Sequence, residues 1–133
     1  MKVLNLTQHP LYLYDMKDSF KSPILRKFVL KDDNCKPIKT IPSYKTCSVN
    51  MKTRAFSYID GIPVFDNEIF SLDPLPKSDD PFTIYIVSSY YAQAYYTLYP
   101  HDETTQIYTV SGVIYTSDGR KNIGIRGITK YRT

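Results

Sequence analysis

The pattern of apolar positions changes its period once, within residues 83–99, and this stretch predicts the central element of the domain. Thr83 to Val87 alternates in β-branched and aromatic residues, as a strand does. From Val87 onward the apolar residues recur three or four positions apart, which is typical of one helix face. They are Val87, Tyr91, Ala94, Tyr95 and Leu98. The pattern therefore predicts a strand that runs directly into a helix over residues 88–99.

Other runs along the chain have the composition and alternation of strands. They are residues 3–6, 11–14, 24–30, 41–49, 52–59, 62–65, 107–116 and 122–130. Asp60-Gly61 and Asp118-Gly119 each stand between two such runs and predict hairpin turns, because the Asp-Gly pair tolerates positive φ. Together the runs predict a single α+β domain over residues 1–133, in which a mostly antiparallel β-sheet packs on the principal helix.

Tyrosine carries most of the aromatic content, since the chain has 13 Tyr, 6 Phe and no Trp. Six of the tyrosines lie between Tyr85 and Tyr99, which is more than one helix can bury on a single face. Tyrosine combines a flat apolar ring with a polar tip, so it suits the half-exposed edge of a core, a ligand pocket or a subunit contact. The pattern leaves these three interpretations open.

The formal charge of +4 is unevenly distributed along the chain. Residues 59–82 contain six acidic residues and one lysine, whereas residues 119–133 contain five basic residues and no acid. A basic end of this kind can bind an anionic ligand or the acidic segment of the same chain. Because no run of Lys and Arg is interleaved with aromatic residues, we expect no nucleic-acid partner.

The residues that carry common catalytic and metal chemistry are few and scattered. Cys35 and Cys47 form no Cys-x-x-Cys pair, and only His9 and His101 could share a metal with them, so we expect no metal site. The chain has no glycine motif for nucleotide phosphates and no Gly-x-Ser-x-Gly elbow, so we expect no cofactor and no catalytic residue. No stretch resembles a signal core or a membrane span, and we expect a cytoplasmic protein without a membrane partner.

A binding site for an anionic ligand can be assembled from residues around the predicted helix. Backbone amides at a helix N-terminus hold phosphate, with help from hydroxyl groups and arginine, and aromatic rings stack on bases. The candidates are Ser88 and Ser89 at the helix start, Tyr90 or Tyr91 for stacking, and Arg126 or Arg120 for charge. The same serines also fit a simple helix cap without a ligand.

The first residues also carry a resemblance to a known group of proteins. Asn5-Leu6-Thr7-Gln8-His9-Pro10 resembles the start of a group of small bacteriophage proteins, in which Asn-Leu-Thr-Pro-His is usual. Later segments resemble the same group in the same order: Ile41-Pro42-Ser43, Leu75-Pro76, Tyr85-Ile86-Val87-Ser88, Ala94, and Asp118-Gly119-Arg120 with Gly124. The resemblance covers the first ten residues and most of residues 75–128.

Some small phage proteins capture nucleotide signals of bacterial immunity, so the resemblance implies an anti-defence role of this kind. The expected protein binds a second messenger, either a cyclic ADP-ribose derivative of Thoeris or a cyclic dinucleotide of CBASS, without cleaving it. It would act as a sponge in the cytoplasm of the infected host, as a homo-oligomer with pockets near subunit contacts. The implied site residues are Asn5, Thr7 and His9 as polar pocket groups, Ser88 and Ser89 on phosphate, Tyr90 and Tyr91 as stacking groups, and Arg126 as a charge partner.

Two other functions fit the same residues. A protein-binding inhibitor or a structural phage component would use the tyrosines and the basic end as an interface. An enzyme that degrades the signal would require His9 and an acid such as Asp118 to be adjacent in space.

Overall fold

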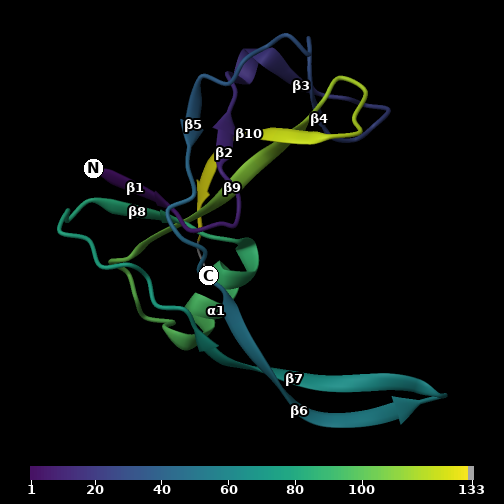
Figure 1. The fold of residues 1–133 in the computed structure, drawn as a ribbon, viewed down its shortest axis with the longest axis vertical. Helices are drawn as coiled ribbons and strands as arrows, with labels where there is room; N and C mark the ends of the chain where they lie inside the picture. The colour runs from purple at the N-terminus through teal and green to yellow at the C-terminus, as the bar shows by residue number, and fades with distance from the viewer. Residues whose placement is uncertain (132–133) are drawn as a thin grey trace.

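Short and long strands dominate the computed structural model, which describes residues 1–131 (Figure 1). The elements are β1 (Lys2–Asn5), β2 (Leu11–Leu13), the 3-10 turn η1 (Met16–Asp18), β3 (Ser19–Lys21), β4 (Phe28–Leu30), β5 (Lys39–Ile41), β6 (Val49–Ile59), β7 (Ile62–Leu72), β8 (Thr83–Ile86), α1 (Ser89–Leu98), β9 (Gln106–Tyr115) and β10 (Asn122–Lys130).

Six of these strands curl into a barrel-like sheet that is nearly closed. The order of neighbours is β1-β8-β9-β10-β2-β5. The first and last strands of this order meet through Asn5 and Ser43, which form an isolated parallel bridge just beyond β5. The amide of Tyr44 donates to the carbonyl of Asn5 at 2.8 Å and reinforces this closure. The hairpin β3–β4 attaches outside this ring, because β4 pairs with β9.

The predicted fold class is wrong in its central feature, the mostly antiparallel sheet on a principal helix. The chain does combine strands with a helix, as a coarse α+β description requires. In the large sheet, however, β1–β8, β8–β9, β10–β2 and β4–β9 are parallel pairs, and only β9–β10, β2–β5 and β3–β4 are antiparallel. The pair β8–β9 is parallel because the chain returns through α1, a crossover that a hairpin turn cannot provide. The other three parallel pairs join strands that are distant in the sequence. Alternation along one strand does not encode the direction of its partner.

The helix α1 covers one end of the barrel. Its buried face consists of Tyr91, Ala92, Ala94 and Tyr95. This face packs into a core cluster with Leu4, Leu6, Val87 and Ile107 from the strand ends and the adjoining chain. A second cluster fills the barrel interior around Leu11, Ile86 and Ile125, and a third lies beneath β3–β4 around Tyr14, Leu30 and Ile114.

The strands β6 and β7 form a separate two-stranded hairpin that points away from the barrel (Figure 1). The hairpin turn predicted at Asp60-Gly61 is confirmed, and both residues have positive φ, 51° and 77°, as a two-residue turn of this class requires. Each strand is eleven residues long, so β7 extends well beyond the residues 62–65 that the pattern indicated. We call β6–β7 the arm.

Residues 24–30 and 41–49 differ most from the predicted strands. Only Phe28–Leu30 is extended in the first segment, because Ser22 to Lys27 forms a turn in which Arg26 has a φ of 56°. In the second, β5 ends at Ile41, before Pro42, which has no amide to donate to a ladder. The amide of Cys47 instead donates to the carbonyl of Leu6 at 3.1 Å, so this segment closes the barrel as irregular chain.

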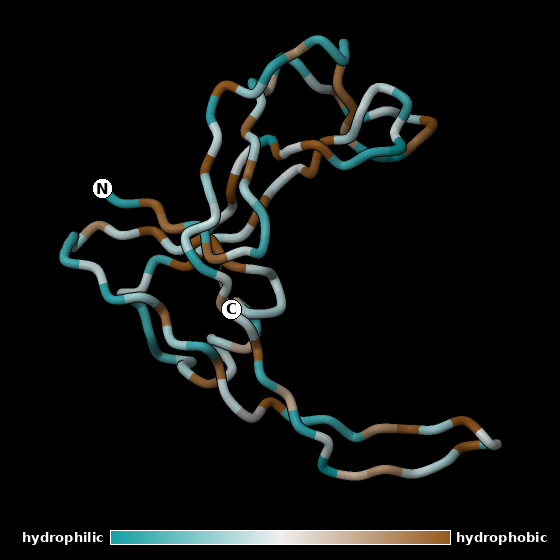
Figure 2. Tube along the Cα trace, in the orientation of Figure 1, coloured by the Kyte–Doolittle hydropathy of each residue, from teal (hydrophilic) through white to brown (hydrophobic). Residues whose placement is uncertain are grey.

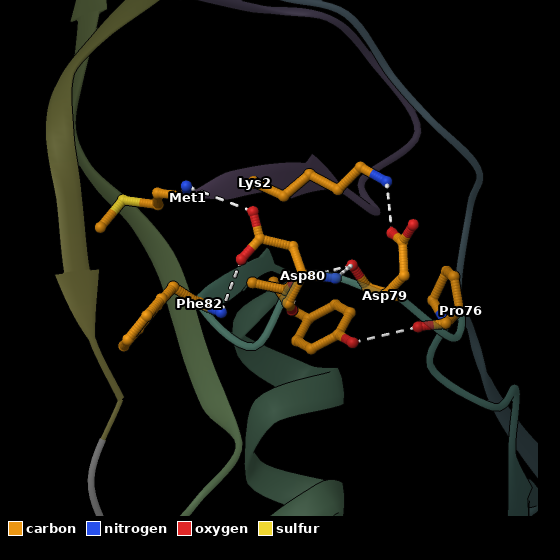
Figure 3. Close-up of polar contacts among 9 residues, drawn as sticks. Met1, Lys2, Pro76, Asp79, Asp80 and Phe82 are labelled. Carbon is orange, nitrogen blue, oxygen red and sulfur yellow. Dashed lines mark hydrogen bonds and ion pairs between the residues drawn. The ribbon is translucent and has the colours of Figure 1, made fainter.

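The proline-rich segment between β7 and β8 is fastened to the N-terminal strand (Figure 3). The terminal amino group lies 3.2 Å from the carboxylate of Asp80, and Lys2 lies 3.6 Å from Asp79. The phenol of Tyr85 donates to the carbonyl of Pro76 at 3.0 Å. The segment therefore runs along the barrel as a pinned surface loop. Among residues 1–131, no helix has the length and apolarity that a membrane span needs.

Candidate functional site

A cleft of about 910 Å³ lies between β2, residues 33–37 and the hairpin β9–β10. Its volume falls within the range of sites that bind small molecules. Leu11, Val110 and Ile125, which also belong to the interior cluster of the barrel, form part of its apolar lining. Tyr12 and Tyr14 add two aromatic rings. The cleft therefore offers apolar and aromatic walls suited to a ring-containing ligand.

The charges that border this cleft leave positive groups available. Lys36 and Lys121 line it, both are exposed, and within residues 1–131 neither ammonium group has a hydrogen-bond or ion-pair partner. The acid of the cleft, Asp33, is already engaged, because its carboxylate accepts from the amide and the hydroxyl of Ser117 at 2.8 and 2.7 Å. The free ammonium groups favour an anionic ligand.

Gly124 shapes the wall of the cleft formed by β2 and β10. A Cβ atom at this position would lie 2.5 Å from the ring of Tyr14 and 2.6 Å from the carbonyl oxygen of Tyr12. The absence of a side chain thus lets β2 lie directly against β10. Burial raises the pKa of the Tyr14 phenol, with smaller contributions from Cys35 and Tyr12. Tyr14 is therefore neutral at physiological pH.

The N-terminal motif residues Asn5 and Thr7 hold the turn that leads into β2. Asn5 is 0% exposed. Its amide nitrogen donates to the carbonyls of His9 and Ile41 at 2.9 and 3.2 Å, and its oxygen accepts from the amide and hydroxyl of Thr7 at 3.0 and 2.6 Å. These contacts use all four hydrogen-bonding positions of the side-chain amide. Asn5 therefore closes the barrel, and it has no position left for a ligand.

Thr7 and His9 are the predicted site residues that line the cleft. The hydroxyl of Thr7, whose single proton goes to Asn5, also lies 3.0 Å from the carbonyl oxygen of His9, so the turn is compact. The His9 side chain is exposed, and in the described part of the chain no hydrogen bond or ion pair joins it to Asp118. Asp118 instead accepts from Thr116 and from the amide of Arg120. The enzyme alternative therefore has no support from a bond between these two residues, and it stays a prediction.

The predicted site residues at the helix start lie away from the cleft. The hydroxyl of Ser88 accepts from the amide of Tyr91 at 3.1 Å, so it is a helix cap, and Ser89 is exposed beside it. Tyr91 is 1% exposed and its phenol donates to the carbonyl of Asp73 at 2.6 Å. Tyr90 is exposed, and its hydroxyl contacts the sulfur of Met51 at 3.0 Å. Both tyrosines thus brace the base of the arm, and Tyr91 has no free face for stacking.

Arg126 lies neither in the cleft nor at the helix start, but beside β4. Its guanidinium lies over the ring of Phe28, 4.3 Å from the centroid, and one nitrogen lies 3.5 Å from the carbonyl of Met16. Gly112 provides the space for it, since a Cβ there would lie 2.9 Å from the Arg126 side chain. The predicted site residues are therefore divided among the cleft, the helix start and the surface near β4, and their ligand contacts remain predictions.

A compact polar cluster joins the end of α1 to β9. The Tyr95 phenol donates to the Asp102 carboxylate, which also accepts from the hydroxyl and amide of Thr105 at 2.7 and 3.1 Å. The hydrogen bonds from Tyr95 and Thr105 hold the pKa of Asp102 well below its usual range. Burial, with the bond to Asp102, raises the pKa of Tyr95 to about 12. At neutral pH both groups keep fixed protonation states, so this cluster stabilises structure.

The sequence analysis did not single out the groups that define the cleft, above all Lys36, Lys121 and Tyr12. They come from separate segments, which meet because β2 pairs with β10 in parallel and because Asp33 binds Ser117. Gly124 was a usable signal, since glycine within a strand marks close backbone approach. No group of three or more His, Cys, Asp or Glu side chains that could hold a metal occurs among the described residues.

Comparison with protein families, curated proteins and solved structures gives no match for this chain. The case for a function therefore comes from the cleft itself.

Proposed function

We propose that this protein is a non-catalytic binding protein whose cleft captures an anionic, nucleotide-derived signal. The observation that carries the proposal is a cleft of about 910 Å³ with apolar walls and two ammonium groups that have no partner within residues 1–131. A nucleotide presents the matching chemistry, a flat ring system joined to phosphate. Sites of this class combine apolar walls with a few placed polar groups.

The cleft residues divide into two roles under this proposal. Tyr12, which is 41% exposed, offers aromatic surface for the base, and stacking of this kind is worth about 1–3 kcal/mol per base. Tyr14 is 8% exposed and contributes to the apolar wall behind it. Lys36 and Lys121 neutralise phosphate, and the exposed ring of His9 can add a hydrogen bond. Asp33 accepts two hydrogen bonds from Ser117, and within residues 1–131 no hydrogen bond joins it to His9, so the arrangement favours retention of the ligand over cleavage.

The biological setting of this proposal comes from the resemblance of the Asn5 to Pro10 motif to small phage proteins. The ligand would be an immune second messenger of the cyclic ADP-ribose type or a cyclic dinucleotide. Its sequestration in the cytoplasm of an infected bacterium would blunt a Thoeris or CBASS response. We further propose that the protein acts as a homo-oligomer.

A ligand screen tests the proposal. Calorimetry and thermal shift are run against cyclic ADP-ribose isomers, related ADP-ribose conjugates and cyclic dinucleotides, and the bound ligand is recovered by heating and identified by chromatography. Binding followed by recovery of the intact molecule supports a sponge. Recovery of a converted product would show an enzyme, and no binding to any member would overturn the proposal.

A charge-matched pair of variants locates the site. Lys36→Ala with Lys121→Ala removes both ammonium groups of the cleft and is expected to weaken binding by about tenfold or more for each lost contact. Lys31→Ala with Lys130→Ala removes the same charge from exposed positions outside the cleft and should leave affinity unchanged. Equal loss in both double variants would indicate non-specific attraction of anions.

The alternative of a protein-binding inhibitor or structural phage component requires an exposed aromatic surface. On α1, Tyr91 and Tyr95 are buried, and the exposed Tyr90 and Tyr99 stand at opposite ends of the helix, so they form no continuous surface. Exposed aromatic residues gather on the arm, in the arrangement described below.

A further inference from the structure

The outer half of the arm exposes its side chains, although the two strands of the arm are the longest of the chain. Every residue from Met51 to Pro63 is exposed. A hairpin of two strands is marginally stable in water unless one of its faces packs on something else. The hydropathy trace shows apolar segments on both strands near the tip, far from the barrel (Figure 2). Within residues 1–131, the outer half of the arm therefore has no packing partner.

One face of this outer half is aromatic. Phe56 lies opposite Phe65, and Tyr58 lies opposite Pro63, so these four side chains share a face. The ring centroids of Phe56 and Phe65 are 4.9 Å apart, and those of Phe56 and Tyr58 are 5.1 Å apart. The three rings nevertheless remain 51%, 59% and 65% exposed for Phe56, Phe65 and Tyr58. We call these four residues the aromatic face.

The edges of the arm are protected against the addition of another strand. Charged residues lie nearer the barrel, where Arg54 pairs with Asp66 at 2.7 Å and Lys52 with Glu68 at 3.6 Å. Register shifts interrupt the ladder between Asn50 and Met51 and between Thr53 and Ala55. Charges, bulges and a proline are the usual devices that prevent edge pairing. The outer half of the arm therefore presents two open faces, one with Ile59 and Ile62, which are 65% and 63% exposed, and the aromatic face. The aromatic face is the one on which the rings lie in contact.

The base of the arm is fixed to the barrel. The carboxylate of Asp73 accepts from the amide of Ser48 at 2.9 Å and from the side chain of Asn50 at 3.2 Å. Tyr91 binds the carbonyl of Asp73, and Tyr90 contacts Met51. These contacts hold the arm in one orientation, so the aromatic face is presented in a defined position.

We propose that the aromatic face is a dimerisation surface, which packs against the same face of a second copy of this chain about a two-fold axis. An isologous contact requires a self-complementary patch, and an apolar face whose neighbouring charges are paired within the arm meets this condition. With the arms antiparallel, the Asp60 residues at the two tips lie at opposite ends of the contact and do not repel each other.

The exposed area suits a dimer of this kind. Three rings of about 150–250 Å² each, at half to two-thirds exposure, present roughly 350 Å² per chain. Two copies would bury roughly 700 Å² of aromatic surface, and since non-polar area is a little over half of a specific interface, the total is about 1,200 Å². This value is at the lower end of the range for specific interfaces. The dimer should therefore dissociate on dilution.

The test is sedimentation velocity over a dilution series, without nucleotide. The wild-type mass should rise from the 15.4 kDa of one chain toward twice that value as the concentration increases. Phe56→Ser with Phe65→Ser should raise the dissociation constant at least tenfold. Ile24→Ser with Phe82→Ser removes side chains that are 88% and 68% exposed elsewhere and should leave the dissociation constant unchanged.

Tyr58→Asp is a second variant, since a single charge on each aromatic face would disrupt the dimer even if the double variant misfolds. Thermal unfolding monitors the fold of every variant. A wild-type protein that stays monomeric at all concentrations overturns the proposal, and it does so even if the protein binds lipid vesicles or host proteins. A Phe56→Ser/Phe65→Ser or Tyr58→Asp variant that is folded and still dimerises also overturns it. Because the cleft is intact in all of these variants, failure here does not affect the proposed ligand binding.

Discussion

The barrel and the arm are built from similar alternating sequences, but the barrel buries its apolar residues and the arm exposes them. In the barrel, Ile86, Ile107 and Ile114 are completely buried by neighbouring strands and the helix. In the arm, Phe56 and Ile62 are more than half exposed. The comparison teaches that alternation predicts a strand, whereas burial depends on partners that the strand itself does not specify.

The asparagines of the two regions also differ in burial and in the number of hydrogen bonds they make. Asn5 in the barrel is buried and makes four hydrogen bonds within the chain. Asn67 in the arm is exposed and accepts one hydrogen bond, from the hydroxyl of Thr53 at 2.9 Å. If the barrel carries most of the stability and the arm contributes little, the same substitution should lower the free energy of unfolding much more in the barrel than in the arm.

The largest difference is expected for the same substitution at these two asparagines. Asn5→Asp deprives the carbonyls of His9 and Ile41 of their donor and buries a carboxylate, so it should lower the free energy of unfolding by about 3 kcal/mol or more. Asn67→Asp keeps the oxygen that accepts from Thr53 and should change the free energy of unfolding by no more than about 0.5 kcal/mol. Urea denaturation measures both values, and similar losses would remove the distinction between the regions.

A second pair of variants tests close packing within the barrel. Gly124→Ala places a Cβ against Tyr14 and the backbone of Tyr12, and overpacking of this kind costs about 1–3 kcal/mol. Gly127→Ala on the same strand meets no atom within 4 Å, so its stability should be equal to that of the wild type or slightly higher. Thermal unfolding of the pair checks this, and a Gly124→Ala variant as stable as Gly127→Ala would contradict the described approach of β2 to β10.

A smaller effect is expected where the arm joins the barrel. Tyr91→Phe removes the hydrogen bond to the carbonyl of Asp73 and should cost about 1 kcal/mol, because that carbonyl stays partly buried. Tyr90→Phe loses only a contact to sulfur at an exposed position and should cost less than about 0.5 kcal/mol. Limited proteolysis of the arm should accelerate in Tyr91→Phe and not in Tyr90→Phe. Equal rates in the two variants would show that Tyr91 does not hold the arm.

The smallest effect is a pH dependence at the end of α1. The pKa of Asp102 is lowered in the folded chain by hydrogen bonds from Tyr95 and Thr105, so its contribution to stability is present above the unfolded pKa of about 4. That contribution is lost as the pH falls through the lower folded pKa. Asp102→Asn should therefore flatten the loss of stability below pH 4 in denaturation curves measured at several pH values. An unchanged acid slope would refute this.

Local features of the fold could be predicted from the sequence because their determinants are adjacent in the chain. The passage from β8 into α1 follows from the change in period at Val87, and Ser88 caps the helix as its position indicated. The turn at Asp60-Gly61 follows from the conformational tolerance of that pair. The parallel pairings could not be predicted, because they depend on which distant strand lies alongside.

The same limit applies to the candidate site. His9 was named from the N-terminal motif and does line the cleft, but Lys36 and Lys121 had no distinguishing neighbours in the sequence. Tyr91 had the composition of a stacking group, yet its position on the inner face of α1 buries it. A site made of separate segments becomes visible only when the sheet order that assembles it is known.

The central claim, that the cleft is where a nucleotide binds, is tested most directly by an NMR titration of the labelled protein with cyclic ADP-ribose isomers and cyclic dinucleotides. The account predicts that saturable shifts cluster at Tyr12, Lys36, Lys121 and Ile125, while amides of the arm do not move. Shifts centred on Ser88 to Tyr91, or no saturable shift with any of these nucleotides, would contradict it.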